Sequence, residues 1–148
     1  MEIKIKKLRE GAIIPCKATA GSAAYDVYIP QDYTVKQGRQ VIPLGFAIEM
    51  PYGLEAKIEP RSGFASKGME AADRIRHDCD VISGKIDSDY RGECGVIVNN
   101  RSCEFRLQAG ARVAQMTIYW VEDAEFTPAQ ELSDTDRGEG GFGHSGVH

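Results

Sequence analysis

The sequence predicts an all-β domain, because short apolar stretches recur along the chain with the two-residue alternation of strands. Helical periodicity is almost absent, which argues against a helical bundle or an alternating α/β fold. The length of 148 residues matches one ordinary domain that can bury a core without disulfides or metals. We therefore expect one β-domain over residues 1–130 and a C-terminal arm over residues 131–148 that is not a separate domain.

Three strands with a regular pattern are predicted in the first sixty residues. Residues 2–6 and 54–59 alternate apolar with charged side chains, as a half-buried strand does. Residues 25–29 are typical of a strand that ends at Pro30 and carries one acid, Asp26. From the pattern alone we expect the Asp26 carboxylate to face solvent, because charged side chains are seldom buried.

Two further segments have less regular patterns. Residues 38–50 predict a pair of strands, interrupted by Pro43 and Gly45, which are typical of an edge or a bulge. Residues 60–63 contain a proline and a glycine and predict a turn. Residues 68–80 lack alternation, so we predict a long loop that contains at most one or two helical turns.

The stretch 84–92 lies between two apolar runs and predicts the tip of a β-hairpin. It carries two carboxylates, Asp87 and Asp89, and the aromatic ring of Tyr90. Surface loops held by a rigid sheet are frequent sites of chemistry, so on the residues alone either carboxylate is a candidate catalyst.

The last predicted strands lie at 104–107 and 112–121, joined by a turn, and Trp120 is expected in the core. After them, residues 131–148 contain five glycines and no periodic apolar pattern, so this segment cannot form a core of its own. Either a disordered tail or an arm that becomes ordered on a ligand fits this composition.

Charge and cysteine content limit the class of function. A net charge of −4 argues against a general nucleic-acid or membrane-surface binder, because both need a basic face. The four cysteines have no Cys-x-x-Cys spacing, and the beginning of the sequence has no secretory signal pattern. We therefore expect reduced thiols in a cytoplasmic protein, without a membrane span and without direct contact to nucleic acid.

Three short stretches together offer the chemistry of a nucleotide site: Arg61-Ser62-Gly63, Asp87 with Tyr90, and the segment 137–143. Arginine and glycine-rich backbone can bind phosphate oxygens, a carboxylate can act as a general base, and aromatic rings can stack on a base. Neither a Walker motif nor a Gly-x-Gly-x-x-Gly turn after a strand is present, which disfavours the common nucleotide-binding folds.

The chain resembles the homotrimeric dUTP pyrophosphatase (dUTPase) family, whose five ordered motifs all have counterparts between about residues 18 and 146. The counterparts are Ala24-Tyr25-Asp26-Val27, Pro60-Arg61-Ser62-Gly63-Phe64-Ala65, Gly84-Lys85-Ile86-Asp87-Ser88-Asp89-Tyr90-Arg91-Gly92-Glu93, Arg112-Val113-Ala114-Gln115-Met116 and Arg137-Gly138-Glu139-Gly140-Gly141-Phe142-Gly143-His144-Ser145-Gly146. Five motifs in order are far more specific than any one of them.

The resemblance implies a jelly-roll-like (β-clip) subunit with a flexible glycine-rich C-terminal arm. Three subunits would form three active sites at their interfaces, each completed by the arm of another subunit. The implied reaction is hydrolysis of dUTP to dUMP and pyrophosphate with Mg²⁺, which keeps uracil out of DNA and supplies dUMP.

The resemblance also implies a role for each site residue. Asp87 would activate the water that attacks the α-phosphorus in line, and Asp26 would hold Mg²⁺ through its water shell. Substrate binding falls to the remaining matched positions: Arg61, Ser62, Gly63, Lys85, Ile86, Tyr90, Gly95, Gln115, Arg137, Phe142, Gly143 and Ser145. Among these, Tyr90 would exclude a 2′-hydroxyl and Phe142 would stack on uracil.

Some assignments stay open at this point. Arg112 fits equally well a subunit contact or a phosphate contact, and Arg91 with Glu93 is expected to be a solvated or interface pair with a structural rather than a catalytic role. A relative of the dCTP deaminases, which share the fold, and a nucleotide-responsive binding protein using the loop 68–80 are the alternative functions. Pyrophosphate release, ammonia release and dUTP-dependent partner binding distinguish the three.

Overall fold

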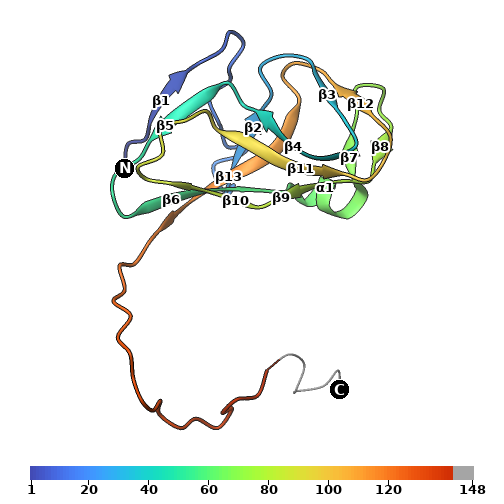
Figure 1. Cartoon of the computed structure of the whole chain (residues 1–148). Coiled ribbons are helices and arrows are strands. Elements are labelled where there is room, and N and C mark those ends of the chain that lie inside the picture. The colour runs from blue at the N-terminus through green and yellow to red at the C-terminus, as the bar shows by residue number, and fades with distance from the viewer. Residues whose placement is uncertain (142–148) are drawn as a thin grey trace.

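Short β-strands form almost all of the regular structure in residues 1–141, which are the residues that the computed structural model describes (Figure 1). The elements follow along the chain in the order β1 (Lys4–Lys7), β2 (Tyr25–Tyr28), β3 (Tyr33–Val35), β4 (Gly38–Pro43), β5 (Phe46–Glu49), β6 (Leu54–Glu59), α1 (Ser62–Lys67), β7 (Met69–Glu70), β8 (Arg76–His77), β9 (Cys79–Ile82), β10 (Gly84–Asp87), β11 (Gly95–Asn100), β12 (Phe105–Leu107) and β13 (Arg112–Trp120). The prediction of an all-β, jelly-roll-like subunit is confirmed.

Two larger sheets organise the domain, and all their strand pairs are antiparallel. One sheet has the order β10-β6-β13-β2, and the other has the order β4-β11-β9. Strand pairs β1-β5, β12-β3 and β7-β8 complete the fold. The four-stranded sheet is the one that matters most for function, because it carries predicted site residues on both of its edge strands.

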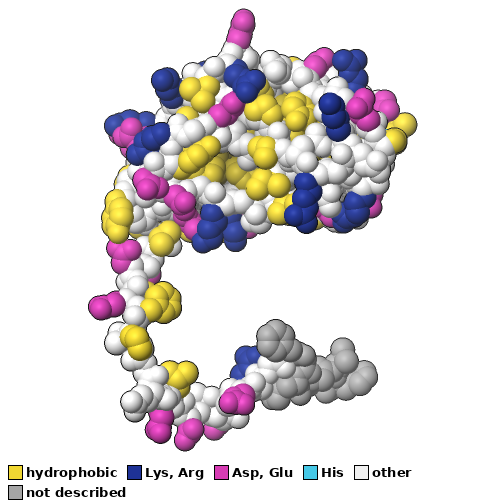
Figure 2. Space-filling model, viewed as in Figure 1, with side chains coloured by type: hydrophobic (Ala, Val, Ile, Leu, Met, Phe, Trp, Pro, Cys, Tyr) yellow, Lys and Arg dark blue, Asp and Glu magenta, His cyan; other side chains and the backbone are white. Residues whose placement is uncertain are grey.

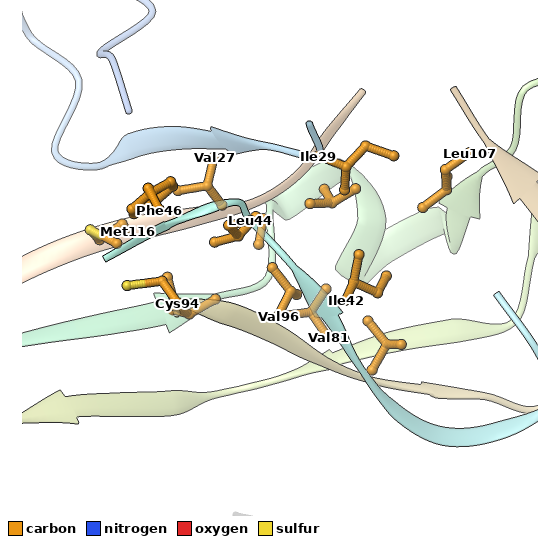
Figure 3. Packing of buried hydrophobic residues seen from close by; sticks show 14 of the residues in the cluster. Val27, Ile29, Ile42, Leu44, Phe46, Val81, Cys94, Val96, Leu107 and Met116 are labelled. Atoms are coloured by element: carbon orange, nitrogen blue, oxygen red, sulfur yellow. The ribbon is translucent and has the colours of Figure 1, made fainter. Parts of the chain in front are cut away.

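The core lies between these sheets and consists of apolar side chains that point toward one another from several strands (Figure 3). Ile42, Phe46 and Val96 are fully buried. Every second residue of β6 and of β11 is buried, which is the two-residue period that the sequence showed. Burying each such side chain stabilises the fold by about 1.5–3 kcal/mol, so the core holds the sheets in fixed register.

The strands predicted within 38–50 exist, but they do not pair with each other as expected. β4 pairs with β11, and β5 pairs with β1. The chain changes sheets at Gly45, whose φ is +78° and where a Cβ would lie 3.0 Å from Pro30 Cγ and 3.2 Å from Ala12 Cβ. Only glycine accepts both this conformation and this close approach, so the bend is built into the sequence.

The prediction of a long loop over 68–80 is wrong, since this segment contains β7, β8 and the beginning of β9. The strands β7 and β8 have two residues each, too few to produce a recognisable alternation. Fully buried Met69 anchors the segment in the core. The helix of this region begins earlier, at Ser62, where a turn was predicted.

Trp120 lies at the end of β13 and is 75% exposed, so its predicted place in the core is wrong. It pairs with Leu54, the first residue of β6, and is the last residue of β13. Past Trp120, residues 121–141 have no helix or strand and run away from the domain (Figures 1 and 2). Among residues 1–141, no helix is long and apolar enough to cross a membrane.

Candidate active site

A hollow with a volume of about 830 Å³ opens beside the β2 edge of the four-stranded sheet. Its walls come from the chain before β2, from α1, from the β7–β8 hairpin, from the turn before β13 and from β13 itself. Five of the predicted site residues contribute to its lining: Asp26, Arg61, Ser62, Gly63 and Gln115. The structure therefore brings these five predicted residues together in one hollow.

Asp26 is the central carboxylate of this hollow. Its side chain is only 11% exposed, and it forms ion pairs with two arginines. Arg61 Nε lies 3.2 Å from Asp26 Oδ1, and Arg112 Nη1 lies 3.2 Å from Asp26 Oδ2. The expectation of a solvent-facing acid is wrong, because paired guanidinium groups compensate the cost of burying the charge.

Strand register explains why these residues meet. Asp26 on β2 lies opposite Gln115 on β13, and Gln115 lies opposite Glu59 at the end of β6. Arg61 follows two residues later in an extended conformation, and Ser62 begins α1. The sheet thus brings an acid, an amide and an arginine to one edge. Arg112 also lines the hollow, where it contacts Asp26.

The hollow has an excess of positive charge within an acidic chain. Its charged lining residues comprise four arginines and two carboxylates: Arg61, Arg74, Arg76, Arg112, Asp26 and Glu70. The whole chain carries a net charge of −4, so this local excess of two positive charges is opposite in sign to the rest. Fixed guanidinium groups around a concave surface favour an anion such as a phosphate chain.

Asp87 lies elsewhere, at the exposed end of edge strand β10. It is directly opposite Glu55 of β6, so two carboxylates face each other across the strand pair. Lys85 Nζ lies 2.5 Å from Glu55 Oε2, and this ion pair, together with the nearby Asp87, raises the pKa of Lys85 above its usual value. The lysine offsets the like-charge repulsion at this edge, and its side chain is directed to Glu55.

The turn after Asp87 is ordered by its own polar contacts. The backbone N–H of Tyr90 donates to the Asp87 carbonyl at 3.1 Å, and the Tyr90 hydroxyl donates to the Glu93 carbonyl at 3.2 Å. Arg91 Nη1 donates to the carbonyls of Ser88 and Tyr90, at 2.6 and 3.0 Å. The tip is therefore a defined shape that holds an exposed carboxylate beside an exposed phenol.

Glu93 fixes this turn to the domain, and the predicted Arg91–Glu93 pair is wrong. The partner of Glu93 is Arg9, whose Nε and Nη2 donate to the carboxylate at 2.6 and 2.8 Å. The Gly45 backbone N–H donates to the same carboxylate at 3.0 Å. The Arg9 hydrogen bonds hold the pKa of Glu93 below its usual value of 4.5, against the opposing effect of burial.

Ile86 and Gly95 occupy the strands that frame the turn. The Ile86 side chain is 7% exposed and faces the core opposite Ala56. Only the Ile86 backbone is therefore presented at the open edge of the four-stranded sheet. A Cβ on Gly95 would lie 2.5 Å from Val41 Cγ1 and 3.2 Å from the Ile42 carbonyl oxygen. Gly95 is thus required for β11 to approach β4 closely.

Within one chain, Asp87 and Tyr90 lie far from Arg61, Ser62 and Gln115. Asp87 lies beside Glu55 near the start of β6, whereas Arg61 lies six residues beyond Glu55 past the other end of that strand. At about 3.3 Å per extended residue, the separation is about 20 Å. The structure therefore does not bring Asp87 and Tyr90 together with Arg61, Ser62 and Gln115 within one subunit.

The predicted arm residues form a third group. Arg137 is exposed, and its Nε donates to the Gly140 carbonyl at 2.7 Å, within the arm itself. Phe142, Gly143 and Ser145 lie outside the described residues.

Residues of the β7–β8 hairpin were missed by the sequence reasoning. Glu70, Arg74 and Arg76 all line the hollow. The signal available was a cluster of charges between residues 70 and 76, in a segment interpreted as a loop.

The chain is similar to known proteins over nearly its whole length. The sequence model of the dUTPase family matches residues 10–146. The chain is 43% identical to the deoxyuridine 5′-triphosphate nucleotidohydrolase of Nautilia profundicola, with 99% of each chain covered. It is 39% identical to the protein of the same name from Oryza sativa subsp. japonica, with 98% of this chain and 81% of the relative covered.

Solved structures show the same fold. A mutant dUTPase of Staphylococcus bacteriophage 80alpha, determined with dUpNHpp, has a TM-score of 0.86 at 24% identity and covers 99% of each chain. A mutant dUTPase from phage phi11 of S. aureus, described with a structural Mg(II) ion, has a TM-score of 0.77 at 20% identity, with 89% of this chain and 99% of that chain covered.

The structure is an all-β domain with a concave surface that is lined by more arginines than carboxylates. The chain belongs to the dUTPase family.

Proposed function

We propose that this enzyme hydrolyses dUTP to dUMP and pyrophosphate, with Asp87 as the general base that activates the attacking water. The observation that supports this role is the exposed position of the Asp87 carboxylate at the rim of an ordered turn, next to Tyr90. A carboxylate is a weak base at neutral pH, so its contribution comes mainly from holding the water in line with the α-phosphorus.

We propose that three subunits assemble so that Asp87 and Tyr90 of one subunit face the hollow of another. Asp87 and Arg61 of one chain are separated by about 20 Å along β6, a distance that no side chain can bridge, so two chains are needed to bring these residues together. Exposed Trp120 and Tyr119 at the end of β13 are an additional reason, because large apolar side chains on a monomer surface are typical of subunit contacts.

The hollow would bind the triphosphate. Gln115 lines it from β13, Arg61 lines it from the segment between β6 and α1, and Ser62 and Gly63 are the first residues of α1. Charge-assisted hydrogen bonds of the kind that Arg61 would make contribute about 1.5–3 kcal/mol each.

Asp26 would hold Mg²⁺ through water, and its surroundings fit this role. Both carboxylate oxygens are already engaged by guanidinium groups, which disfavours direct coordination and leaves lone pairs for water ligands. Among residues 1–141 there is no cluster of three or more His, Cys, Asp or Glu side chains that could hold a metal alone. Such an ion, held by one carboxylate and the substrate phosphates, would reduce the negative charge on the phosphates.

Selectivity for deoxyuridine would come from the turn and the arm. The edge backbone of Lys85 and Ile86 would pair with uracil, and the Tyr90 ring would pack on the sugar where a 2′-hydroxyl has no room. A base with the opposite donor pattern, such as cytosine, would leave buried polar groups unpaired. Gly95 keeps the adjacent strands close, which would exclude the methyl group of thymine.

The arm would close the site. Arg137 and Ser145 would bind the γ-phosphate, Phe142 would stack on the base, and Gly143 would allow the backbone to approach closely. An arm that excludes water strengthens every ionic interaction beneath it. We place the enzyme in the cytoplasm, in keeping with four cysteines that are all free thiols.

The direct test is pyrophosphate release from dUTP, dCTP, dTTP and UTP with Mg²⁺, with ammonia measured in parallel. The expected result is strong preference for dUTP and no ammonia. Equal turnover of the four nucleotides, or ammonia release from dCTP, would contradict the proposed function.

A further inference from the structure

The β7–β8 hairpin contributes to the wall of the hollow that Arg61, Ser62 and Gln115 also line. Arg74 in its turn and Arg76 on β8 both line the hollow. The turn is docked onto β12, because the Ala72 backbone N–H donates to the Arg106 carbonyl at 2.8 Å. This wall therefore has a fixed position relative to the rest of the hollow.

Glu70 holds the two guanidinium groups side by side. Arg74 Nη1 lies 3.0 Å from Glu70 Oε1, and Arg76 Nη2 lies 2.8 Å from Glu70 Oε2. Arg76 also donates to the Gly68 carbonyl at 3.3 Å. Each guanidinium has five donor hydrogens, so most of them remain available to a ligand. One carboxylate for two arginines leaves a local positive charge.

Arg74 has the only positive φ, +69°, of any non-glycine residue in the described part of the chain. Its N–H donates to the Ala71 carbonyl at 3.0 Å, and the Ala71 N–H donates to the Ile75 carbonyl at 2.8 Å, so the turn enforces this conformation. Glycine would adopt it without strain, whereas a side chain adopts it at a cost. Because glycine would suit this backbone conformation better, we expect the arginine side chain at position 74 to have a function.

We propose that Arg74 and Arg76 bind the terminal phosphate of the bound nucleotide, and the pyrophosphate product, and so set the preference for a triphosphate over a diphosphate. This inference rests on the proposed function and assigns a role to the hairpin. Planar guanidinium groups pair with phosphate oxygens through two parallel hydrogen bonds. Because Glu70 competes for the same donors, only a highly charged phosphate group reaching this wall displaces it.

The first experiment measures binding of inorganic pyrophosphate with Mg²⁺, and of dUMP, to the full-length protein by calorimetry. Relative to wild type, the Arg74→Gln/Arg76→Gln variant should bind pyrophosphate about tenfold more weakly and dUMP unchanged, allowing for the exposure of these side chains. Its ratio of kcat/KM for dUTP over dUDP should fall by a similar factor. Arg101→Gln is the matched control, because Arg101 pairs with Asp80 and does not line the hollow.

Two single variants separate ligand binding from support of the fold. Arg74→Gly removes the guanidinium and relieves the strained φ, so the melting temperature should stay or rise while pyrophosphate binding weakens. Glu70→Gln frees both arginines, so pyrophosphate should bind about threefold more tightly although an ion-pair partner is lost. If these residues only supported the fold, Arg74→Gly would lower the melting temperature, and Glu70→Gln would not tighten pyrophosphate binding.

Unchanged pyrophosphate affinity in folded Arg74→Gly and in the double variant would overturn the inference, as would an equal loss of dUMP binding. If wild type binds pyrophosphate through this wall but releases none from dUTP, the proposed function fails and the site stands. If wild type hydrolyses dUTP and the variants bind pyrophosphate normally, only the role of the hairpin fails.

Discussion

The hollow around Asp26 and the turn around Asp87 are two carboxylate sites built on opposite principles. The Asp26 side chain is 11% exposed and is held by Arg61 and Arg112. The Asp87 residue is exposed, and its side chain receives no hydrogen bond from any other described residue. A buried carboxylate must be paired to be tolerated, whereas an exposed one remains free to bind water. Under the proposed function, one chain supplies the phosphate end of the site from the Asp26 hollow, and a neighbouring chain supplies the Asp87 end.

The largest effect is expected at the exposed carboxylate. Asp87→Asn should lower kcat roughly a thousandfold, since it removes the base, while dUTP binding changes little. Steady-state kinetics and calorimetry with a non-hydrolysable analogue check the two parts. Asp89→Asn is the matched control and should keep nearly full activity; a wild-type rate in Asp87→Asn would remove Asp87 from the mechanism.

The second largest effect is expected from removal of the arm. Deleting residues 136–148 should leave a folded domain, because residues 121–141 add no strand to the sheets, yet reduce kcat/KM about a hundredfold through lost positioning and water exclusion. Circular dichroism checks the fold and pyrophosphate release checks the activity. Unchanged kinetics would mean that the arm has no part in closure.

The buried carboxylate should affect stability as well as activity. Asp26→Asn leaves Arg61 and Arg112 without their partner and should lower the free energy of unfolding by about 2 kcal/mol, a value reduced because Arg112 is half exposed. Urea denaturation measures it. The same variant should need more Mg²⁺ for half-maximal rate, and an unaltered Mg²⁺ dependence would contradict the role of Asp26.

A smaller, pH-dependent effect is expected at the anchor of the turn. Arg9 lowers the pKa of Glu93 below 4.5, so the carboxylate's stabilising contribution is complete above that pH and is lost as the pH falls through the folded-state pKa. In thermal denaturation from pH 7 to pH 3, the melting temperature of the wild type should therefore fall at the acidic end, and Glu93→Gln should lack this contribution to the fall.

Glu10→Gln, in which an exposed acid of the same loop changes, serves as the control and should retain the wild-type pH profile. If Glu93→Gln and wild type lose stability in parallel, the Arg9–Glu93 contact does not anchor the turn.

Much of the fold followed from local pattern. The alternation in β6 and the apolar runs on either side of residues 84–92 predicted strands that the structure contains. The predicted hairpin tip over 84–92 is partly wrong, because residues 84–87 form strand β10, which pairs with β6. Patterns could not predict which strands pair: β4 and β5 separate at Gly45 because of packing against Pro30 and Ala12, which are distant in sequence. The two-residue strands β7 and β8 are too short for any periodicity.

The site was predictable to the extent that its motifs are contiguous. Arg61, Ser62 and Gln115, which come from two separate motifs, line the same hollow. The burial of Asp26 was not visible in the strand pattern, because it depends on Arg112, which is 86 residues away. Likewise, Glu93 pairs with Arg9 and not with its near neighbour Arg91, since Arg9 is brought beside it only by the fold.

The claim that one site combines two subunits has a direct test in mixed trimers. Asp87→Asn and Arg61→Gln should each be nearly inactive alone, whereas refolding them together from denaturant at equal amounts should restore activity. For random assembly, about a quarter of the shared sites would receive an intact Asp87 from one subunit and an intact Arg61 from another, so about a quarter of wild-type activity is predicted. Activity no greater than the sum of the two separate variants would contradict a shared site.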